Sequence, residues 1–384
     1  MKIAIPKERR ENEKRVAASP DTVKKFVGLG AEIIVETGAG IASSFQDQDY
    51  LDAGATIAAD AASALKDADV VLKVQRPLTS AEGGPDELSL MKSGATLIAQ
   101  LAPLQNKEQV ADYAKAGVNA VAMELVPRIS RAQSMDVLSS QSNLAGYKAV
   151  LDATAVYGKA LPMMMTAAGT IAPARAFIMG VGVAGLQAIA TVRRLGAIVT
   201  ATDVRAATKE QVESLGAKFV MVETDETGED AGGYAKEMSD DYKKRQAELV
   251  FEHIKKQDIV ITTALIPGRA APILITDEML AVMKPGSVIV DLAVEAGGNV
   301  TQSKPGEVVT TDNGVIIVGH LNVPSRLASD ASSLFARNLF NYLTPMIDKE
   351  SGALAMNWDD EIVQGSALTR DGKIIHPLLI EGGN

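Results

Sequence analysis

Residues 177–205 read FIMGVGVAGLQAIATVRRLGAIVTATDVR, in which two apolar runs flank a glycine-rich turn and a helix-like stretch. The turn has the spacing Gly180-x-Gly182-x-x-Gly185. In a strand–turn–helix unit, the first glycine permits a tight turn, the second lets the backbone approach a pyrophosphate, and the third lets the helix pack on the strand. The unpaired N–H groups and the dipole at the start of the helix favour an anionic group. This segment therefore predicts a dinucleotide site in an α/β fold.

An acidic residue, Asp203, ends the second apolar run. A carboxylate at this point accepts hydrogen bonds from the adenosine ribose hydroxyls and repels a 2′-phosphate, which favours NAD(H) over NADP(H). Arg205 keeps the alternative open, because a nearby arginine is the residue that a 2′-phosphate would use. We expect NAD(H) as the bound cofactor.

Composition narrows the class of protein and of partner. With 384 residues, 47% of them hydrophobic and 4% aromatic, the chain suits two α/β domains. The net charge of −10 makes nucleic acid a poor partner, and the absence of cysteine excludes a disulfide framework and a thiol nucleophile. The three histidines have no metal-ligand spacing, so no metal site is predicted. The apolar runs are shorter than the ~20 residues of a membrane helix, and we expect a cytoplasmic chain without direct membrane insertion.

Apolar runs alternate with helix-like segments along the chain, as a doubly wound α/β fold requires. The pattern predicts a long helix at 139–159 and strands at 2–5, 32–36, 70–74, 96–101, 118–123, 218–222, 258–264, 287–293 and 315–320. A helix after His320 is expected to cross back to the first domain. We therefore predict two doubly wound Rossmann-like domains with parallel sheets, separated by a cleft: 1–138 plus 328–384, and the NAD(H)-binding domain 139–327.

Residues 223–241, ETDETGEDAGGYAKEMSDD, interrupt this alternation because they are acidic and lack apolar periodicity. Long insertions of this kind in compact domains are usually functional or disordered. We interpret the segment as a mobile lid, with a solvated surface excursion as the alternative.

A second polar segment, residues 124–143, lies between a predicted strand and the long helix. Arg128 and Gln133 have the donors to bind a nicotinamide carboxamide and a pyrophosphate, and Asp136 can hold Arg128 in place. The alternative is a salt-bridged linker between domains. Arg15 and Lys73 are also able to bind a small carboxylate, but basic residues near strand ends are commonly solvated, and we expect that of both.

Together these residues resemble one superfamily, which comprises alanine dehydrogenase and the NAD(H)-binding component of proton-translocating nicotinamide nucleotide transhydrogenase. The resemblance runs along essentially the whole chain. It is most specific in PRISRAQSMDVLSSQSNLAGY at 127–147, MMMTAAGT at 163–170, GVGVAGLQAIATVRRLGA at 180–197, ALIPGR at 264–269 and DLAVEAGGN at 291–299. The RISRAQSMDVLSS loop resembles the transhydrogenase branch.

The two branches differ in chemistry. The dehydrogenases use an arginine, a lysine, a histidine in an LHLA motif and an aspartate; here the counterparts are Arg15, Lys73, Ala102 in LAPL, and Glu295. Without the histidine, imine chemistry lacks its proton carrier, whereas hydride transfer between two nicotinamides needs none. The resemblance therefore favours transhydrogenation, with an amino acid dehydrogenase and an NADH-sensing module as the alternatives.

The resemblance also implies the site residues. Those that orient the nicotinamide and its ribose for hydride transfer are Arg128, Gln133, Asp136 and Ser139. The other residues that it implies for cofactor binding are Ile129, Ser130, Arg131, Leu138, Gly180, Val181, Gly182, Val183, Gly185, Asp203, Val204, Arg205, Gly233, Gln246, Ala264 and Leu265, with Tyr234 on the lid.

The implied partners are an NADP(H)-binding component, a transmembrane proton-channel component and a second copy of the chain, forming a homodimer. In that arrangement NADH on this chain faces NADP+ on the partner, and proton translocation resides on the membrane component. The chain would then be attached to the inner face of the cytoplasmic membrane through its partners.

Overall fold

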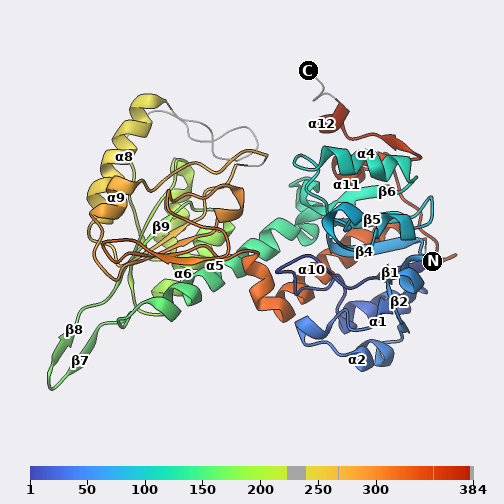
Figure 1. Ribbon diagram of the computed structural model, residues 1–384, viewed down its shortest axis with the longest axis horizontal. Helices are drawn as coiled ribbons and strands as arrows, with labels where there is room; N and C mark the ends of the chain where they lie inside the picture. Colours follow the sequence, from blue (N-terminus) through green and yellow to red (C-terminus); the bar gives the residue numbers. More distant parts are fainter. Residues whose placement is uncertain (223–238, 267, 349, 381–384) are drawn as a thin grey trace. The chain divides into compact units, whose positions relative to one another are not determined.

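The structure is a computed structural model that describes residues 1–222, 239–266, 268–348 and 350–380. The chain forms two compact units (Figure 1): the first comprises residues 1–141 and 324–384, and the second residues 142–323. The lid predicted at 223–241 lies outside the described residues, except that Ser239 caps helix α8 and residues 240 and 241 begin it.

The first unit is built on a parallel sheet of six strands in the order β3-β2-β1-β4-β5-β6. Their bounds are β1 Lys2–Ile5, β2 Glu32–Glu36, β3 Thr56–Ala58, β4 Val70–Gln75, β5 Thr96–Gln100 and β6 Asn119–Ala122. The chain runs outward from β1 to β3 and then restarts beside β1 with β4. This reversal of direction marks the doubly wound topology, and it places the carboxyl ends of β1 and β4 at a switch point.

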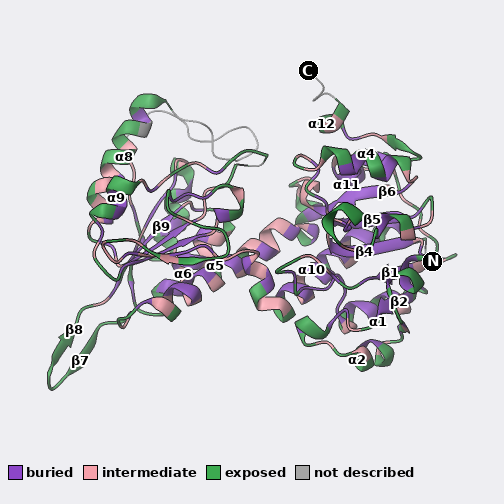
Figure 2. Ribbon diagram, viewed as in Figure 1, coloured by how far each residue is buried: buried purple, intermediate pink, exposed green. Residues whose placement is uncertain are grey.

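Helices cover both faces of this sheet, so the strands are buried on both sides, as all-parallel sheets require (Figure 2). One face packs on α1 Pro20–Gly28 and α10 Ala328–Leu343, and the other on α3 Ala61–Leu65 and α4 Lys107–Lys115. The remaining elements of the unit are α2 Asp47–Asp52, α11 Glu361–Ser366, α12 Pro377–Ile380 and the small antiparallel pair β16 Thr369–Arg370 and β17 Lys373–Ile374.

Helix α1 illustrates how local sequence sets an element. Ser19 caps its N-terminus, where the side-chain oxygen accepts a hydrogen bond from the N–H of Thr22. Pro20 occupies the first turn, in which its missing N–H costs no helical hydrogen bond. Val23 and Phe26 then lie on the buried face, three positions apart.

The second unit repeats the topology with the order β11-β10-β9-β12-β13-β15-β14, in which only β14 runs antiparallel. The strands are β9 Arg175–Met179, β10 Ile198–Thr202, β11 Lys218–Phe219, β12 Ile259–Thr262, β13 Val288–Asp291, β14 Val308–Thr310 and β15 Ile316–Val318. The helices are α5 Val137–Val156, which begins in the first unit, α6 Val183–Arg194, α7 Lys209–Ser214, α8 Asp240–Ile254 and α9 Asp277–Ala281.

Successive residues of β9 belong to opposite layers of this unit. Ala176 and Ile178 join the core that includes α5 and α6, whereas Phe177 and Met179 join the core that includes α8 and α9. The predicted α/β class with doubly wound parallel sheets is thereby confirmed. A hairpin formed by β7 Met164–Thr166 and β8 Gly169–Ile171 was not predicted.

Among the described residues, no helix combines the length and the apolar character that crossing a membrane requires.

Candidate dinucleotide-binding site

The turn between β9 and α6 is fixed by contacts with the neighbouring strands. Gly180 has φ +100°, a conformation that side-chain-bearing residues rarely adopt. Its N–H donates to the carbonyl of Thr202 at 2.9 Å, and its own carbonyl accepts from Thr263 Oγ1 at 3.0 Å. A Cβ added at Gly180 would lie 2.5 Å from the Thr263 oxygen, so this position requires glycine.

The other two glycines of the turn differ in their surroundings. A Cβ on Gly185 would lie 2.0 Å from the carbonyl oxygen of Gly180, which shows how closely α6 approaches the strand end. A Cβ on Gly182 would meet nothing within 4 Å. Gly182 is the N-cap of α6 and supplies no side-chain cap, so the first turn of the helix presents backbone donors on an open side. This arrangement fits a pyrophosphate.

Asp203 follows β10 and is 7% exposed. Its carboxylate accepts from the N–H of Val181 at 2.7 Å and from the N–H of Arg205 at 2.9 Å. The Arg205 side chain binds both carboxylate oxygens, through Nε and Nη2 at 2.9 Å each. The structure thus places the predicted ribose-binding carboxylate beside the glycine turn, held by the backbone of that turn. Val204 between them is half-buried, and Val183, at the start of α6, is exposed.

The carboxyl end of β12 lies beside the same turn through the contact between Thr263 and Gly180. Ala264 is clamped by the fully buried Asn299, whose side chain accepts from the Ala264 N–H at 3.0 Å and donates to its carbonyl at 2.9 Å. Asp291 accepts the N–H of Asn299 at 2.9 Å and so fixes the clamp. The clamp orients the backbone that leads to the exposed Leu265.

Sequence reasoning assigned no role to Asn299 or Asp291. The only signal was their place in the DLAVEAGGN stretch, where Gly298 has φ +84°. Gln246 is half-buried on α8. Gly233 and Tyr234 lie outside the described residues.

Helix α5 approaches the start of α6 at Gly146, where a Cβ would lie 2.0 Å from the carbonyl oxygen of Ala184. The sequence signal for this contact is a single glycine within a long helical pattern, which often marks close packing. The contact supports the first turn of α6 from behind.

The polar loop predicted to orient a nicotinamide belongs to the first unit, as the 3₁₀ segment Ser130–Met135 followed by α5. Arg128, Ser130 and Gln133 are exposed, and Ile129 and Leu138 are half-buried. Asp136 accepts hydrogen bonds from the N–H of Ser139 at 2.9 Å and from its hydroxyl at 2.6 Å. These two residues therefore cap α5, which gives them a structural role whatever else they bind.

Arg131 forms a two-pronged ion pair with Asp360, at 2.6 and 2.8 Å, and also binds Glu361. These contacts tie the loop to the start of α11. The loop accordingly has salt-bridged character at Arg131.

Two asparagines of α10 hold the loop from the other side. Asn338 and Asn341 each donate a side-chain hydrogen bond to the carbonyl of Ser134, at 2.9 and 3.1 Å. Ser140 donates to Asn338 Oδ1 at 2.7 Å, which fixes the orientation of that amide. The sequence shows both asparagines among apolar neighbours, but only the fold reveals their common acceptor.

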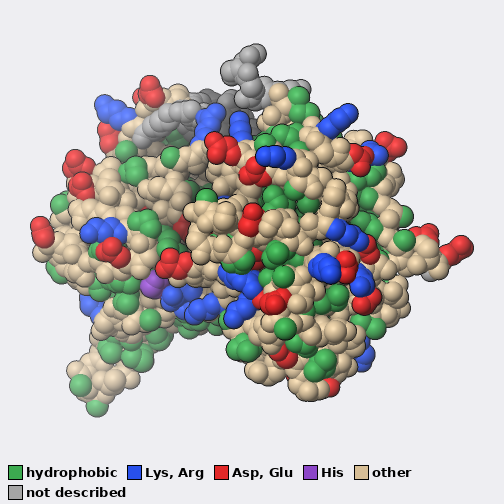
Figure 3. Space-filling view, turned by 45° about the vertical axis from the view of Figure 1, so that its right-hand side comes forward, with side chains coloured by type: hydrophobic (Ala, Val, Ile, Leu, Met, Phe, Trp, Pro, Cys, Tyr) green, Lys and Arg blue, Asp and Glu red, His purple; other side chains and the backbone are tan. Residues whose placement is uncertain are grey.

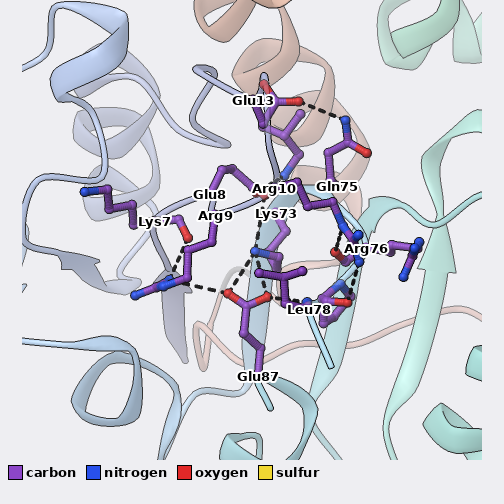
Figure 4. Close-up of polar contacts among 12 residues, drawn as sticks. Lys7, Glu8, Arg9, Arg10, Glu13, Lys73, Gln75, Arg76, Leu78 and Glu87 are labelled. Carbon is purple, nitrogen blue, oxygen red and sulfur yellow. Dashed lines mark hydrogen bonds and ion pairs between the residues drawn. The ribbon is translucent and has the colours of Figure 1, made fainter. Parts of the chain in front are cut away.

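The prediction that Arg15 and Lys73 are solvated is wrong. The Lys73 ammonium is buried between Glu8, at 3.3 Å, and Glu87, at 3.2 Å (Figure 4). Burial raises the pKa of the Glu8 carboxyl, and the nearby Lys73 partly opposes that shift. Arg15, also buried, binds both oxygens of Glu13 at 2.7 and 2.8 Å. The two cations are therefore paired with carboxylates of this chain at the carboxyl ends of β1 and β4.

The remaining counterparts of the dehydrogenase machinery also differ. Ala102 has φ +46° and donates its N–H to the Glu124 carboxylate. Burial raises the pKa of Glu124. Glu295 is exposed and accepts from the N–H of Asn322 at 2.9 Å. Within the parts of the chain that the structure describes, no group of three or more His, Asp or Glu residues is arranged to hold a metal ion.

Comparisons with known proteins agree with this geometry. A family model described as alanine dehydrogenase/PNT, N-terminal domain, matches residues 4–145, and one described as alanine dehydrogenase/PNT, C-terminal domain, matches residues 149–377. An NAD(P) transhydrogenase subunit alpha chain from Rhodospirillum rubrum is 62% identical over 385 residues, covering 100% of each chain. A crystal structure of transhydrogenase from Sinorhizobium meliloti has a TM-score of 0.88 and 54% identity, covering 98% of this chain and 100% of that one.

Alanine dehydrogenase from Halomonas elongata is 30% identical, covering 99% of this chain and 96% of its own length. The chain belongs to the alanine dehydrogenase/PNT family, as its resemblance predicted, and within that family it is more similar to these transhydrogenase chains than to that alanine dehydrogenase.

Proposed function

We propose that this chain is the NAD(H)-binding subunit of a transhydrogenase and passes hydride from NADH to NADP+ held on a partner component. The observation that carries the proposal is the β9–α6 turn, with an open Gly182 backbone at a helix N-terminus and Asp203 beside it. The first groups suit a pyrophosphate and the second suits an unphosphorylated ribose. The names of the relatives supply the reaction class.

NADH supplies the hydride from C4 of its nicotinamide, and the residues of this chain bind and orient it. The N–H groups at the start of α6 hold the pyrophosphate, and Asp203 accepts from the ribose hydroxyls and repels a 2′-phosphate. Arg128, Gln133, Asp136 and Ser139 orient the nicotinamide and its ribose, as the family resemblance implies. Ile129, Ser130, Arg131 and Leu138 flank them in the loop, and Gly233, Tyr234, Gln246, Ala264 and Leu265 complete the lining.

This chemistry requires positioning rather than proton transfer. Hydride passes directly between two nicotinamide rings, so effective geometry supplies the rate without an acid, a base or a metal. Ala102 stands where the related dehydrogenases carry histidine, and Lys73 and Arg15 are paired with Glu8, Glu87 and Glu13. These features disfavour the amino acid dehydrogenase alternative, because imine chemistry needs a proton carrier at the substrate.

The proposed partners are an NADP(H)-binding component and a transmembrane component that carries the protons, with this chain as a homodimer. The words "subunit alpha" in the name of the R. rubrum relative support a chain that works within an assembly. Attachment to the membrane component would hold the chain at the inner face of the cytoplasmic membrane. Support for the homodimer comes from the hairpin β7–β8, whose apolar side chains are exposed.

The direct test mixes the purified chain with a purified NADP(H)-binding component, NADH and a spectrally distinct NADP+ analogue. We expect reduction of the analogue only when both proteins are present. A parallel reaction supplies alanine and NAD+ to the chain alone, and there we expect no NADH. Alanine-dependent NADH formation at ordinary dehydrogenase rates, roughly 1 to 10³ per second, would assign the chain to the other branch.

A further inference from the structure

We propose that Arg205 is an internal competitor for the ribose-binding carboxylate, so that its side chain must leave Asp203 before a dinucleotide binds. The inference rests on the proposed function, because it concerns how the same site is regulated in affinity. It makes Arg205 a residue that limits NADH affinity rather than one that supplies it.

The contacts of Asp203 account for its whole capacity as an acceptor. A carboxylate offers about four lone-pair sites, two on each oxygen. Here Oδ1 accepts from the N–H and the Nε of Arg205, and Oδ2 accepts from the N–H of Val181 and from Nη2 of Arg205. A ribose hydroxyl that donates to this carboxylate therefore needs one of these four positions.

Only two of the four donors are able to leave without unfolding the turn. The N–H groups of Val181 and Arg205 are backbone donors whose positions the turn itself fixes. The Nε and Nη2 donors belong to a side chain that is 19% exposed and has rotatable bonds. Displacement of the guanidinium frees one acceptor position on each oxygen, and the two backbone bonds keep the carboxylate oriented.

The competition has a cost, because the contact to be broken is a charge-assisted, two-pronged pair. Such pairs are shorter and stronger than neutral hydrogen bonds, and the Asp203 side chain is only 6% exposed, which limits screening by solvent. The two residues are two positions apart, so little chain entropy opposes the contact. NADH must therefore break an existing interaction to gain its own.

This arrangement separates two roles that the sequence leaves open for Arg205. An arginine that receives a 2′-phosphate would present its guanidinium to the ligand, whereas here the fork is used by Asp203. As a phosphate receptor, Arg205 would favour NADPH; as a competitor, it weakens every ligand whose ribose uses Asp203.

The experiment measures NADH binding by isothermal titration calorimetry to the wild-type chain, Arg205→Ala, Asp203→Ala and the double variant. We expect Arg205→Ala to bind NADH roughly three- to tenfold more tightly, the range for relief of one partly buried charge-assisted contact. In the Asp203→Ala background the same change should give no gain, because the competition needs the carboxylate. Arg194→Ala, at the exposed C-terminal end of α6, is the charge-matched control and should bind as wild type does.

A second readout follows the guanidinium directly. The Nε–H signal of Arg205, identified by its loss in Arg205→Ala, should shift in ¹⁵N-correlated NMR spectra when 5′-AMP is added, and should not shift with nicotinamide mononucleotide. Equal or weaker NADH binding by a folded Arg205→Ala chain would overturn the inference. If Arg205→Ala weakens NADPH selectively, the residue is a phosphate receptor and the inference is also wrong. Failure of the wild-type chain to bind NADH would instead contradict the proposed function.

Discussion

Gly182 and Gly185 occupy the same turn, yet the structure gives their missing side chains opposite meanings. At Gly185 a methyl group would collide with the backbone carbonyl of Gly180 at 2.0 Å. At Gly182 it would extend into open space, and the backbone there has φ −83°, which any residue adopts. The first glycine therefore serves the fold, and the second serves the ligand.

The pair gives a matched prediction. Gly182→Ala should leave the thermal midpoint of unfolding near wild type and weaken NADH binding at least tenfold, because its methyl group occupies the side on which we place the pyrophosphate. Gly185→Ala should lower the thermal midpoint by several degrees, since a backbone clash of this kind costs on the order of 1–3 kcal/mol. Calorimetric scans and NADH titration of both variants check this. Equal affinity of Gly182→Ala and wild type would remove the pyrophosphate from this turn.

The glycine spacing and Asp203 were readable in the sequence because a local motif of fixed geometry carries them. Their partners were not readable. The Asn299 clamp on Ala264 joins residues 35 positions apart, and the arginine–carboxylate pair at 203 and 205 depends on a rotamer. The burial of Lys73 was missed for a similar reason: its partners Glu8 and Glu87 arrive from other segments of the first unit.

At the scale of elements, strands were predicted where the sheet is buried on both faces. Runs such as β4 and β12 are almost wholly apolar and stand out from their surroundings. Strands β3 and β14 were missed, because each has three residues and a partly exposed pattern that gives no apolar run. β11 is shorter than predicted, since this edge strand pairs with β10 through only two residues.

The loop Ser130–Met135 and helix α10 behave as one element, because Asn338 and Asn341 share the Ser134 carbonyl as acceptor. If the loop orients the nicotinamide, loosening it should misplace the reacting carbon more than it weakens binding. A misplacement of about 1 Å costs on the order of a hundredfold in rate.

We therefore expect the double change Asn338→Ala and Asn341→Ala to slow hydride transfer in the reconstituted complex at least tenfold, about 1.4 kcal/mol in barrier. The dissociation constant for NADH should change less than threefold. Stopped-flow transfer and equilibrium binding on the same protein separate the two effects. Asn313→Ala, which removes an amide bonded to the carbonyls of Leu280 and Met283 in the second unit, is the control for general loss of stability. A rate that falls only in proportion to binding would make the loop a structural linker.

At the scale of the whole molecule, one feature of the second unit is not explained by the folding of a single chain. Every residue from 162 to 172 is exposed, including both strands of the hairpin β7–β8, which stands away from the rest of its unit (Figure 1). Met163 and Met165 are 61% and 79% exposed, and Met164 and Ile171 are 41% and 42% exposed. An isolated two-stranded hairpin is marginally stable in water, so this one gains most if another surface covers it.

The surface of the molecule is otherwise a mixture of charged and apolar side chains on the face that Figure 3 shows. The contrast with the hairpin is in composition: between Pro162 and Ile171 there is no charged side chain. Flexible, polarizable methionine side chains adapt well to a partner surface. A second copy of this chain, which the family resemblance implies, is the occupant that we expect.

The wild-type chain should therefore sediment as a dimer, and Met163→Asp with Met165→Asp should dissociate it. Full burial of a methionine side chain contributes about 1.5–3 kcal/mol, so loss of even one such contact raises the dimer dissociation constant by roughly tenfold or more. Sedimentation velocity over a concentration series measures that shift. Ile41→Asp, which places the same charge on an apolar residue of the first unit that is 57% exposed, should leave the dimer intact. Because NADH binding is assigned to the glycine turn and Asp203, the dissociated variant should still bind NADH. A wild-type chain that stays monomeric throughout, or a hairpin variant that stays dimeric, would place the contact between copies elsewhere or remove it.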